Sequence, residues 1–213
     1  MTDFNVCEHC STYHPLDQRE CVGCEQPLVR DTKGAIALWR LGDIEDGRLG
    51  PLMARLREEF RAPVILQPAF LDERPSERPD WNGLSAKVFL SQVERRHARG
   101  TFLSLGITEK NIVSNSRENF LFGYGLMDGR AAVMSIHPLD DGCDDELLRE
   151  RMFKIAQHEL GHALDLDHHS YEDGIDCVMV GDIEHDSVET IDASDAGFCE
   201  DCAQSVEKHL RRR

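Results

Sequence analysis

The 213-residue sequence lacks any apolar run that approaches the roughly 18 to 20 residues needed to span a bilayer. Its first ten residues, MTDFNVCEHC, contain neither a basic start nor an apolar stretch, so they do not have the pattern of a secretory signal. Internal repeats and low-complexity tracts are also absent. We therefore expect a cytoplasmic protein with no membrane partner.

Basic residues are scarce. The chain has 24 Lys and Arg against 40 Asp and Glu, which gives a formal net charge of −16. Such a surface repels phosphate backbones and offers no basic patch, so we expect no nucleic acid partner. The remaining composition, 40% hydrophobic and 30% charged, is that of an ordinary globular protein, and the length leaves room for one main domain and a small appendage.

Cysteine, by contrast, is abundant for a cytosolic chain, and six of the eight cysteines fall in C-x-x-C pairs. In a reducing compartment this pattern favours metal binding over disulfides. The first two pairs are Cys7, Cys10, Cys21 and Cys24. Two such pairs can make a tetrahedral thiolate site, so we expect a zinc ribbon over residues 1–30, with its own structural zinc, and a main domain over 31–213. A redox pair is the alternative, but it would open a helix within a β-α-β unit, and these pairs precede any such unit.

The first half of the main domain predicts strands alternating with helices. Apolar runs at 35–39 and 64–66 favour buried strands, and apolar residues at helical spacing over 49–60 favour a helix between them. This β-α-β order implies a partly parallel sheet. A second amphipathic helix is predicted over 85–99, after a Pro-rich and charged loop at 72–82.

Further strands are predicted at 101–105 and 112–113. Residues 119–125 and 131–136 flank the Asp-Gly turn at 128–129, a pattern that predicts an antiparallel hairpin. The predicted fold class is therefore α+β, with features of α/β and a mixed, twisted sheet.

Residues 143–164 give the clearest helix signal, because acidic residues open the segment and apolar residues follow at steps of three to four. Within it, HELGH places His158 and His162 one turn apart on one face, where both imidazoles can reach one ion. Glu159 is placed to act as general base on a zinc-activated water and then to pass the proton to the leaving amine. The alternative is a helix that carries two histidines by chance.

A third histidine argues against chance. His168 lies ten residues after His158, where a chain that leaves the helix by a tight turn can return a third nitrogen to the ion. Three nitrogens and one open position are what a catalytic zinc needs. The pattern resembles the metzincin signature HExxHxxGxxH, except that Asp165 replaces the glycine of the turn. We expect residue 165 to be left-handed, a conformation that Asp enters at a cost of about 1 kcal/mol.

The sequence beyond this motif extends the resemblance. Residues 177–179 are Cys-Val-Met, and residues 198–202 are Phe-Cys-Glu-Asp-Cys. This order resembles that of the archaemetzincins, in which a Cys follows the third His, then come Cys-x-Met and a distant Phe-Cys-x-x-Cys, and the four cysteines hold a second, structural zinc. The resemblance covers residues 35–205. It implies a second zinc bound by His169, which replaces the first of those cysteines, and by Cys177, Cys199 and Cys202.

The resemblance has further implications for the site. Met179 would be the Met-turn residue beneath the catalytic histidines, and the edge strand of the predicted hairpin would pair with an extended peptide substrate. Two alternatives concern the second zinc: His169 is an exposed neighbour of the first site, or Cys143 completes a three-cysteine site. Cys143 otherwise lies among acids, where we expect an inert thiol.

Together these features resemble a zinc metallopeptidase with a metzincin catalytic domain that acts on peptides or proteins, and some archaemetzincins are described as aminopeptidases. A catalytically weak scaffold whose ribbon binds a protein partner is the alternative, motivated by Asp165 and His169. Glu159 argues against it, because a structural zinc needs no carboxylate there. Nucleic acid binding through the ribbon is a second alternative. Tyr171 is a candidate to assist the oxyanion, although a packing role is the simpler interpretation.

Overall fold

The computed structural model describes residues 4–6, 13–15, 23, 34–42, 44–70, 83–96, 100–114, 120–127, 129–181, 187–193 and 197–211. Near the N-terminus, β1 (Phe4–Val6) and β2 (Tyr13–Pro15) form an antiparallel pair. The four cysteines of the predicted zinc ribbon, the expected boundary near residue 31 and the predicted loop at 72–82 lie outside the described residues. The ribbon and the boundary therefore stay predictions.

A five-stranded sheet forms the centre of the fold, and it is mixed, as the sequence predicted. Across the sheet the order is β4 (Val64–Leu66), β3 (Ile36–Leu41), β6 (Leu103–Thr108), β10 (Ala131–Ser135) and β9 (Gly123–Gly125). The first four strands are parallel, and β9 pairs antiparallel with β10. One edge of the sheet is therefore the short glycine-containing strand β9.

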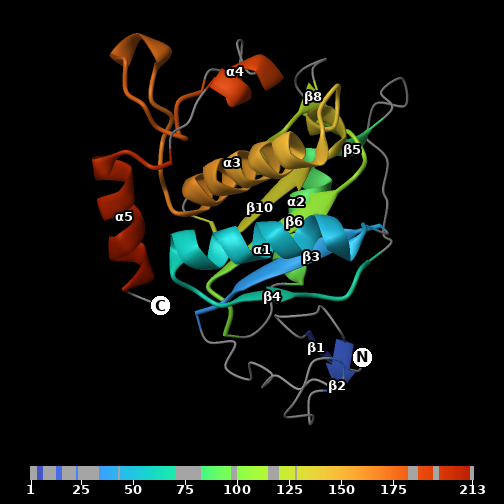
Figure 1. Cartoon of the computed structure of the whole chain (residues 1–213). Helices are drawn as coiled ribbons and strands as arrows, with labels where there is room; N and C mark the ends of the chain where they lie inside the picture. Colours follow the sequence, from blue (N-terminus) through green and yellow to red (C-terminus); the bar gives the residue numbers. More distant parts are fainter. Residues whose placement is uncertain are drawn as a thin grey trace.

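Helices cover both faces of this sheet (Figure 1). On one face lie α1 (Asp46–Phe60) and α3 (Asp145–Ala163), which share a core with alternate residues of the strands, and α5 (Glu200–Leu210) packs at the edge of this core. On the other face lies α2 (Ala86–Arg95). The alternation is clear in β10, where Ala132 and Met134 face the first core and Ala131 and Val133 face the second.

The observed elements confirm the predicted β-α-β unit, since β3, α1 and β4 follow one another and the two strands are parallel. The second predicted helix is shorter than expected at both ends. Ser85 is its N-cap, whose hydroxyl accepts a hydrogen bond from the Val88 amide at 3.5 Å, and α2 ends at Arg95. Residues 97–99, which the prediction included, lie outside the described part of the chain.

The predicted hairpin differs from the structure in its first arm. Of the predicted first arm, only β9 pairs with β10. The preceding strand β8 (Phe120–Leu121) joins a separate three-stranded sheet with β7 (Ile112–Val113) and β5 (Leu84–Ser85). The chain changes sheet at Phe122, whose carbonyl accepts a hydrogen bond from the Ser135 amide at 2.9 Å. The sequence over 119–125, NFLFGYG, does not reveal such a break.

The remaining helical elements are short: η1 (His137–Leu139), η2 (Tyr171–Asp173) and α4 (Val188–Ala193). The long helix α3 begins after Asp144, whose carboxylate accepts hydrogen bonds from the Glu146 and Leu147 amides at 3.1 and 2.9 Å. Within the described part of the chain, no helix combines the length and the apolar character that a membrane span requires.

Candidate metal centre

Three histidine side chains converge at the C-terminal end of α3. His158 and His162 lie one turn apart on the helix, with their Nε2 atoms 3.1 Å apart. The Nε2 atom of His168, which follows the helix, lies 3.0 Å from that of His158 and 2.9 Å from that of His162. Imidazole nitrogens that share one tetrahedral zinc at 2.0–2.1 Å are about 3.3 Å apart, close to these spacings.

Backbone carbonyls orient two of these rings. The Nδ1 atom of His158 lies 2.8 Å from the carbonyl oxygen of Val178, and that of His162 lies 2.8 Å from the carbonyl oxygen of Leu166. Because a carbonyl oxygen only accepts hydrogen bonds, Nδ1 carries the proton in each ring. Nε2 is then unprotonated, and its lone pair is free to bind a metal ion.

The electrostatics of these rings fit a bound cation. Burial and, to a smaller extent, the neighbouring His162 lower the pKa of His158 to about 3, and burial also lowers the pKa of His162. Both imidazoles are therefore neutral at pH 7. Two bare lone pairs 3.1 Å apart cannot form a hydrogen bond with each other, but a shared cation satisfies both.

A tight turn returns the chain from α3 to His168. The Leu166 amide donates to the Gly161 carbonyl at 3.1 Å and the Asp165 amide donates to the His162 carbonyl at 2.9 Å, which is the Schellman pattern of helix termination. Asp165 is the left-handed residue of this motif, with φ of 64°, as the sequence predicted. The same turn aims the Leu166 carbonyl at His162.

The glycines of β9 lie directly over the acidic residue of the motif. Glu159 is only 7% exposed, and a Cβ atom on Gly123 would overlap its side chain, coming within 2.5 Å of Cδ and closer still to Cγ and Oε1. A Cβ atom on Gly125 would lie 2.6 Å from the Glu159 carbonyl oxygen and 2.7 Å from His162 Cβ. We did not predict a role for either glycine, although two glycines at alternate positions of a strand are a signal of close approach.

A second group of metal-binding side chains lies beside the first. The ligand atoms of its four members all lie within 4.8 Å of one another. They are His169, Cys177, Cys199 and Cys202. The Nε2 atom of His169 lies 3.2 Å from Cys202 Sγ and 3.4 Å from Cys199 Sγ. One nitrogen and three sulfurs are a known donor set for a closed, structural zinc site.

The three thiols of this group differ in how readily they ionise. Burial raises the pKa of Cys177 and of Cys202. Burial would raise that of Cys199 too, but hydrogen bonds from the Cys202 and Asp201 amides and from neighbouring thiols outweigh it, so its pKa is lowered. Cys177 Sγ accepts hydrogen bonds from the Met179 and Cys199 amides at 3.4 and 3.2 Å. A bound metal ion would displace the protons of Cys177 and Cys202 and would balance the negative charge of the resulting thiolates.

Cys143 does not join this group, contrary to the alternative in which it completes the second site. It precedes α3 at the opposite end of the helix, where its thiol donates to the Leu139 carbonyl at 3.3 Å. Burial and the carboxylates of Asp140 and Asp144 raise its pKa, while Arg151 opposes them. The expectation of an unreactive thiol agrees with this environment.

Met179 is fully buried beneath α3. Its sulfur would lie 2.5 Å from a Cβ atom on Gly161, so the glycine inside HELGH makes room for it. This is the position that the archaemetzincin resemblance implied for a Met-turn residue. Tyr171, in contrast, is 37% exposed in η2.

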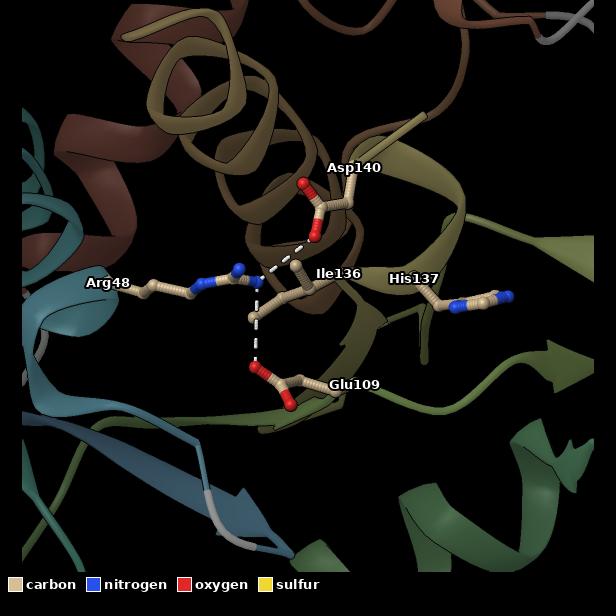
Figure 2. Close-up of a pocket in the computed structure, with 5 residues that line it drawn as sticks. All are labelled: Arg48, Glu109, Ile136, His137 and Asp140. Atoms are coloured by element: carbon tan, nitrogen blue, oxygen red, sulfur yellow. Dashed lines mark hydrogen bonds and ion pairs between the residues drawn. The ribbon is translucent and has the colours of Figure 1, made fainter. Parts of the chain in front are cut away.

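A separate hollow lies near the other end of α3 (Figure 2). Arg48 Nη1 bridges Glu109 and Asp140 there at 3.5 and 3.3 Å, and Ile136 and His137 complete the lining. His158 lies thirteen residues beyond the first residue of α3, about 20 Å along the helix. The hollow is therefore no part of the metal centre.

Comparison with known proteins identifies the family. The model of Peptidase family M54 matches residues 98–208. The archaemetzincin of Archaeoglobus fulgidus is 38% identical over 104 residues, which are 49% of this chain and 59% of that protein. The archaemetzincin of Methanopyrus kandleri is 34% identical over 108 residues, 51% of this chain and 57% of that protein. The aligned sequence thus spans less than two thirds of either relative.

Solved structures extend the likeness. The crystal structure of the Archaeoglobus fulgidus protein, complexed with malonate, superposes with a TM-score of 0.67 at 30% identity, covering 80% of this chain and 99% of that chain. The Methanopyrus kandleri structure has a TM-score of 0.71 at 24% identity, covers 86% and 99%, and shows likeness of fold. With more than half of its residues matched by the family model, the chain belongs to peptidase family M54, the archaemetzincins.

Proposed function

We propose that this protein is a zinc-dependent metallopeptidase in which His158, His162 and His168 bind the catalytic zinc. The observation that carries the proposal is the convergence of three Nε2 atoms within 3.1 Å of one another, beside a buried carboxylate. Zinc, when bound, lowers the pKa of a water molecule and polarises the scissile carbonyl. The neutral, carbonyl-oriented imidazoles of His158 and His162 keep their lone pairs available for that ion.

Glu159 supplies the proton transfers in this proposal. Its carboxylate takes a proton from the attacking water as the new C–O bond forms, and returns it to the amine nitrogen as the C–N bond breaks. Burial between α3 and β9 excludes solvent from the carboxylate and fixes its position. Its place next to the first zinc ligand in the chain supports this assignment.

The substrate in this proposal is an extended peptide. β9 is the terminal strand of the main sheet and crosses the residues of the metal centre, so its outer backbone edge can pair with a peptide across the zinc. Aminopeptidase action is the finer part of the proposal. It predicts faster hydrolysis of peptides with a free N-terminus than of the same peptides after acetylation.

Two further zinc ions complete the proposal. One is held by His169, Cys177, Cys199 and Cys202, supported by the closeness of their ligand atoms. The other is held by Cys7, Cys10, Cys21 and Cys24, supported by their spacing alone. Both donor sets are closed, which assigns these ions structural roles, and the ribbon is the candidate surface for a protein partner.

The test uses a pool of quenched fluorescent peptides with the wild-type protein and Glu159→Gln, which keeps the shape of the side chain and removes the base. We expect the variant to retain its zinc and to lose hydrolysis by about 100-fold or more, the usual contribution of a general base. Equal hydrolysis by the two proteins at equal zinc content would reject Glu159 as the base. No hydrolysis by the zinc-loaded wild type across the pool would favour the scaffold alternative.

A further inference from the structure

The two groups of metal-binding side chains share one short backbone segment, residues 177–181. Val178 supplies the carbonyl that orients His158, at 2.8 Å from Nδ1. Cys177, the preceding residue, belongs to the second group. Met179, the following residue, packs beneath α3 against Gly161. The carbonyl that orients a ligand of the first group therefore lies one residue from a ligand of the second.

The same segment is bonded to the chain that carries the third histidine. His168 belongs to the first group and the adjacent His169 to the second. The His169 amide donates to the Met179 carbonyl at 2.9 Å, and the Gly181 amide donates to the His169 carbonyl at 3.3 Å. A Cβ atom on Gly181 would lie 3.4 Å from both the His158 and His168 rings.

These contacts make the geometry of one group depend on the other. Residues 174–181 contain no helix and only an isolated bridge between His169 and Val180, so little regular structure fixes this segment. Backbone hydrogen bonds hold the segment to residue 169 and to Gly197, whose carbonyl accepts from the Val178 amide at 2.7 Å. Its side-chain anchors are the buried Met179 and Cys177, which lies within the second group beside Cys199 and Cys202. Without a cation in the second group, the Val178 carbonyl and His168 would lose one of the anchors that hold them near His158.

We propose that the second metal group is a positioning device for the first: a cation held by His169, Cys177, Cys199 and Cys202 raises the affinity of the three histidines for zinc. The inference rests on the proposed function, because it takes both groups to be zinc sites. The expected size follows from the partners that orient metal-bound histidines, whose loss lowers metal affinity by about 10- to 100-fold. This is a coupling between two binding sites through a shared backbone element.

The test measures zinc retention by the full-length protein against a graded chelator. Each bound zinc is released over its own range of chelator strength. The release that the wild type shows and His162→Ala lacks is that of the catalytic ion. His169→Asn and Cys202→Ser each remove one ligand of the second group, from the loop and from α5 respectively. The matched control is Cys143→Ser, which removes a thiol that the structure places outside both groups. His169→Cys, which keeps a zinc ligand at this position, is the rescue variant.

We expect His169→Asn and Cys202→Ser to lose one zinc and to release the catalytic ion at chelator strengths about 10- to 100-fold lower, while Cys143→Ser and His169→Cys behave as the wild type. Loss of the second zinc with an unchanged catalytic step would overturn the inference, as would no loss of zinc in both variants. Circular dichroism shows which variants are folded, and the two variants lie in different elements, so one serves if the other unfolds. If His162→Ala loses no zinc, the proposed function fails instead.

Discussion

The carboxylate of Glu159 lies directly against the backbone of Gly123, with no room for a side chain between the edge strand β9 and the helix α3. Gly123→Ala should therefore displace Glu159 and lower kcat, on the order of 100-fold for a shift of about 1 Å in a catalytic group. Zinc content should stay at the wild-type value, because the three histidines are untouched. Kinetics and metal analysis on the same sample separate these effects.

Gly47→Ala is the matched control for this substitution. Gly47 lies near the start of α1, where a Cβ atom would meet nothing within 4 Å. The control should keep wild-type kinetics, and its stability should be unchanged or slightly higher, because Ala favours helix more than Gly by up to about 1 kcal/mol. Equal kcat values for Gly123→Ala and Gly47→Ala would contradict the close packing of Glu159 on β9.

The left-handed turn at Asp165 predicts a stabilising substitution. Asp165→Gly should raise the free energy of unfolding by roughly 0.5–1 kcal/mol, since glycine adopts φ of 64° without steric cost. Asp165→Ala should show no gain. Arg61, which ends α1 with φ of 45°, is also left-handed and lies far along the chain from the metal ligands. Arg61→Gly therefore serves as a second left-handed position at which to compare the effect of glycine on stability. Thermal unfolding that ranks Asp165→Ala at or above Asp165→Gly would refute this interpretation.

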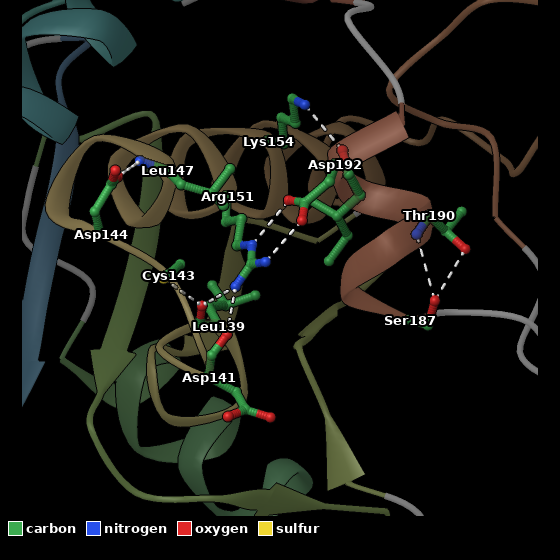
Figure 3. A network of polar contacts seen from close by, with 11 residues as sticks. Leu139, Asp141, Cys143, Asp144, Leu147, Arg151, Lys154, Ser187, Thr190 and Asp192 are labelled. Carbon is green, nitrogen blue, oxygen red and sulfur yellow. Dashed lines mark hydrogen bonds and ion pairs between the residues drawn. The ribbon is translucent and has the colours of Figure 1, made fainter.

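The ion pair between Arg151 and Asp192 joins α3 to α4 (Figure 3). Both carboxylate oxygens accept from the guanidinium, at 2.7 and 2.8 Å, and these hydrogen bonds lower the pKa of Asp192. A lowered pKa in the folded state means that the stabilisation is present above the unfolded value, about 3.9, and is lost as the pH falls through the folded value. Asp192→Asn should therefore destabilise the protein at pH 7, by about 1–3 kcal/mol.

The measurement is chemical denaturation of the wild type and Asp192→Asn from pH 7 to pH 2. The difference between them should be constant down to about pH 4 and shrink below it, because protonation of Asp192 removes the same interaction from the wild type. Asp141→Asn is the control, since Arg151 contacts the Asp141 backbone carbonyl and not its carboxylate. A difference that grows as the pH falls would be inconsistent with the assigned pKa shift.

The sequence allowed the α+β class, the parallel β3-α1-β4 unit and the long helix α3 to be predicted, because periodicity and capping are local properties. It also allowed the left-handed conformation of Asp165 to be predicted, because the position follows from the turn that the motif needs. The change of sheet at Phe122 could not be predicted. It depends on which neighbouring strand, β7 or β10, each half of residues 120–125 pairs with.

In the candidate site, too, the features that depend on nearby residues could be predicted and those that depend on residues far apart in the sequence could not. The spacing of His158, His162 and His168 is encoded locally, and their convergence follows from one helix and one turn. The approach of Gly123 to Glu159 and the shared segment at 177–181 join parts of the chain that are far apart in sequence. Such contacts arise from the packing of the sheet against α3, which the pattern of residues does not specify.

The most direct measurement of the central claim is an anomalous-difference map at the zinc absorption edge from crystals of the full chain. We expect a peak about 2.0–2.1 Å from the Nε2 atoms of His158, His162 and His168, and a separate peak among His169, Cys177, Cys199 and Cys202. Density at the second position with none between the three histidines, in crystals grown with excess zinc, would contradict the catalytic zinc on which the proposed peptidase depends.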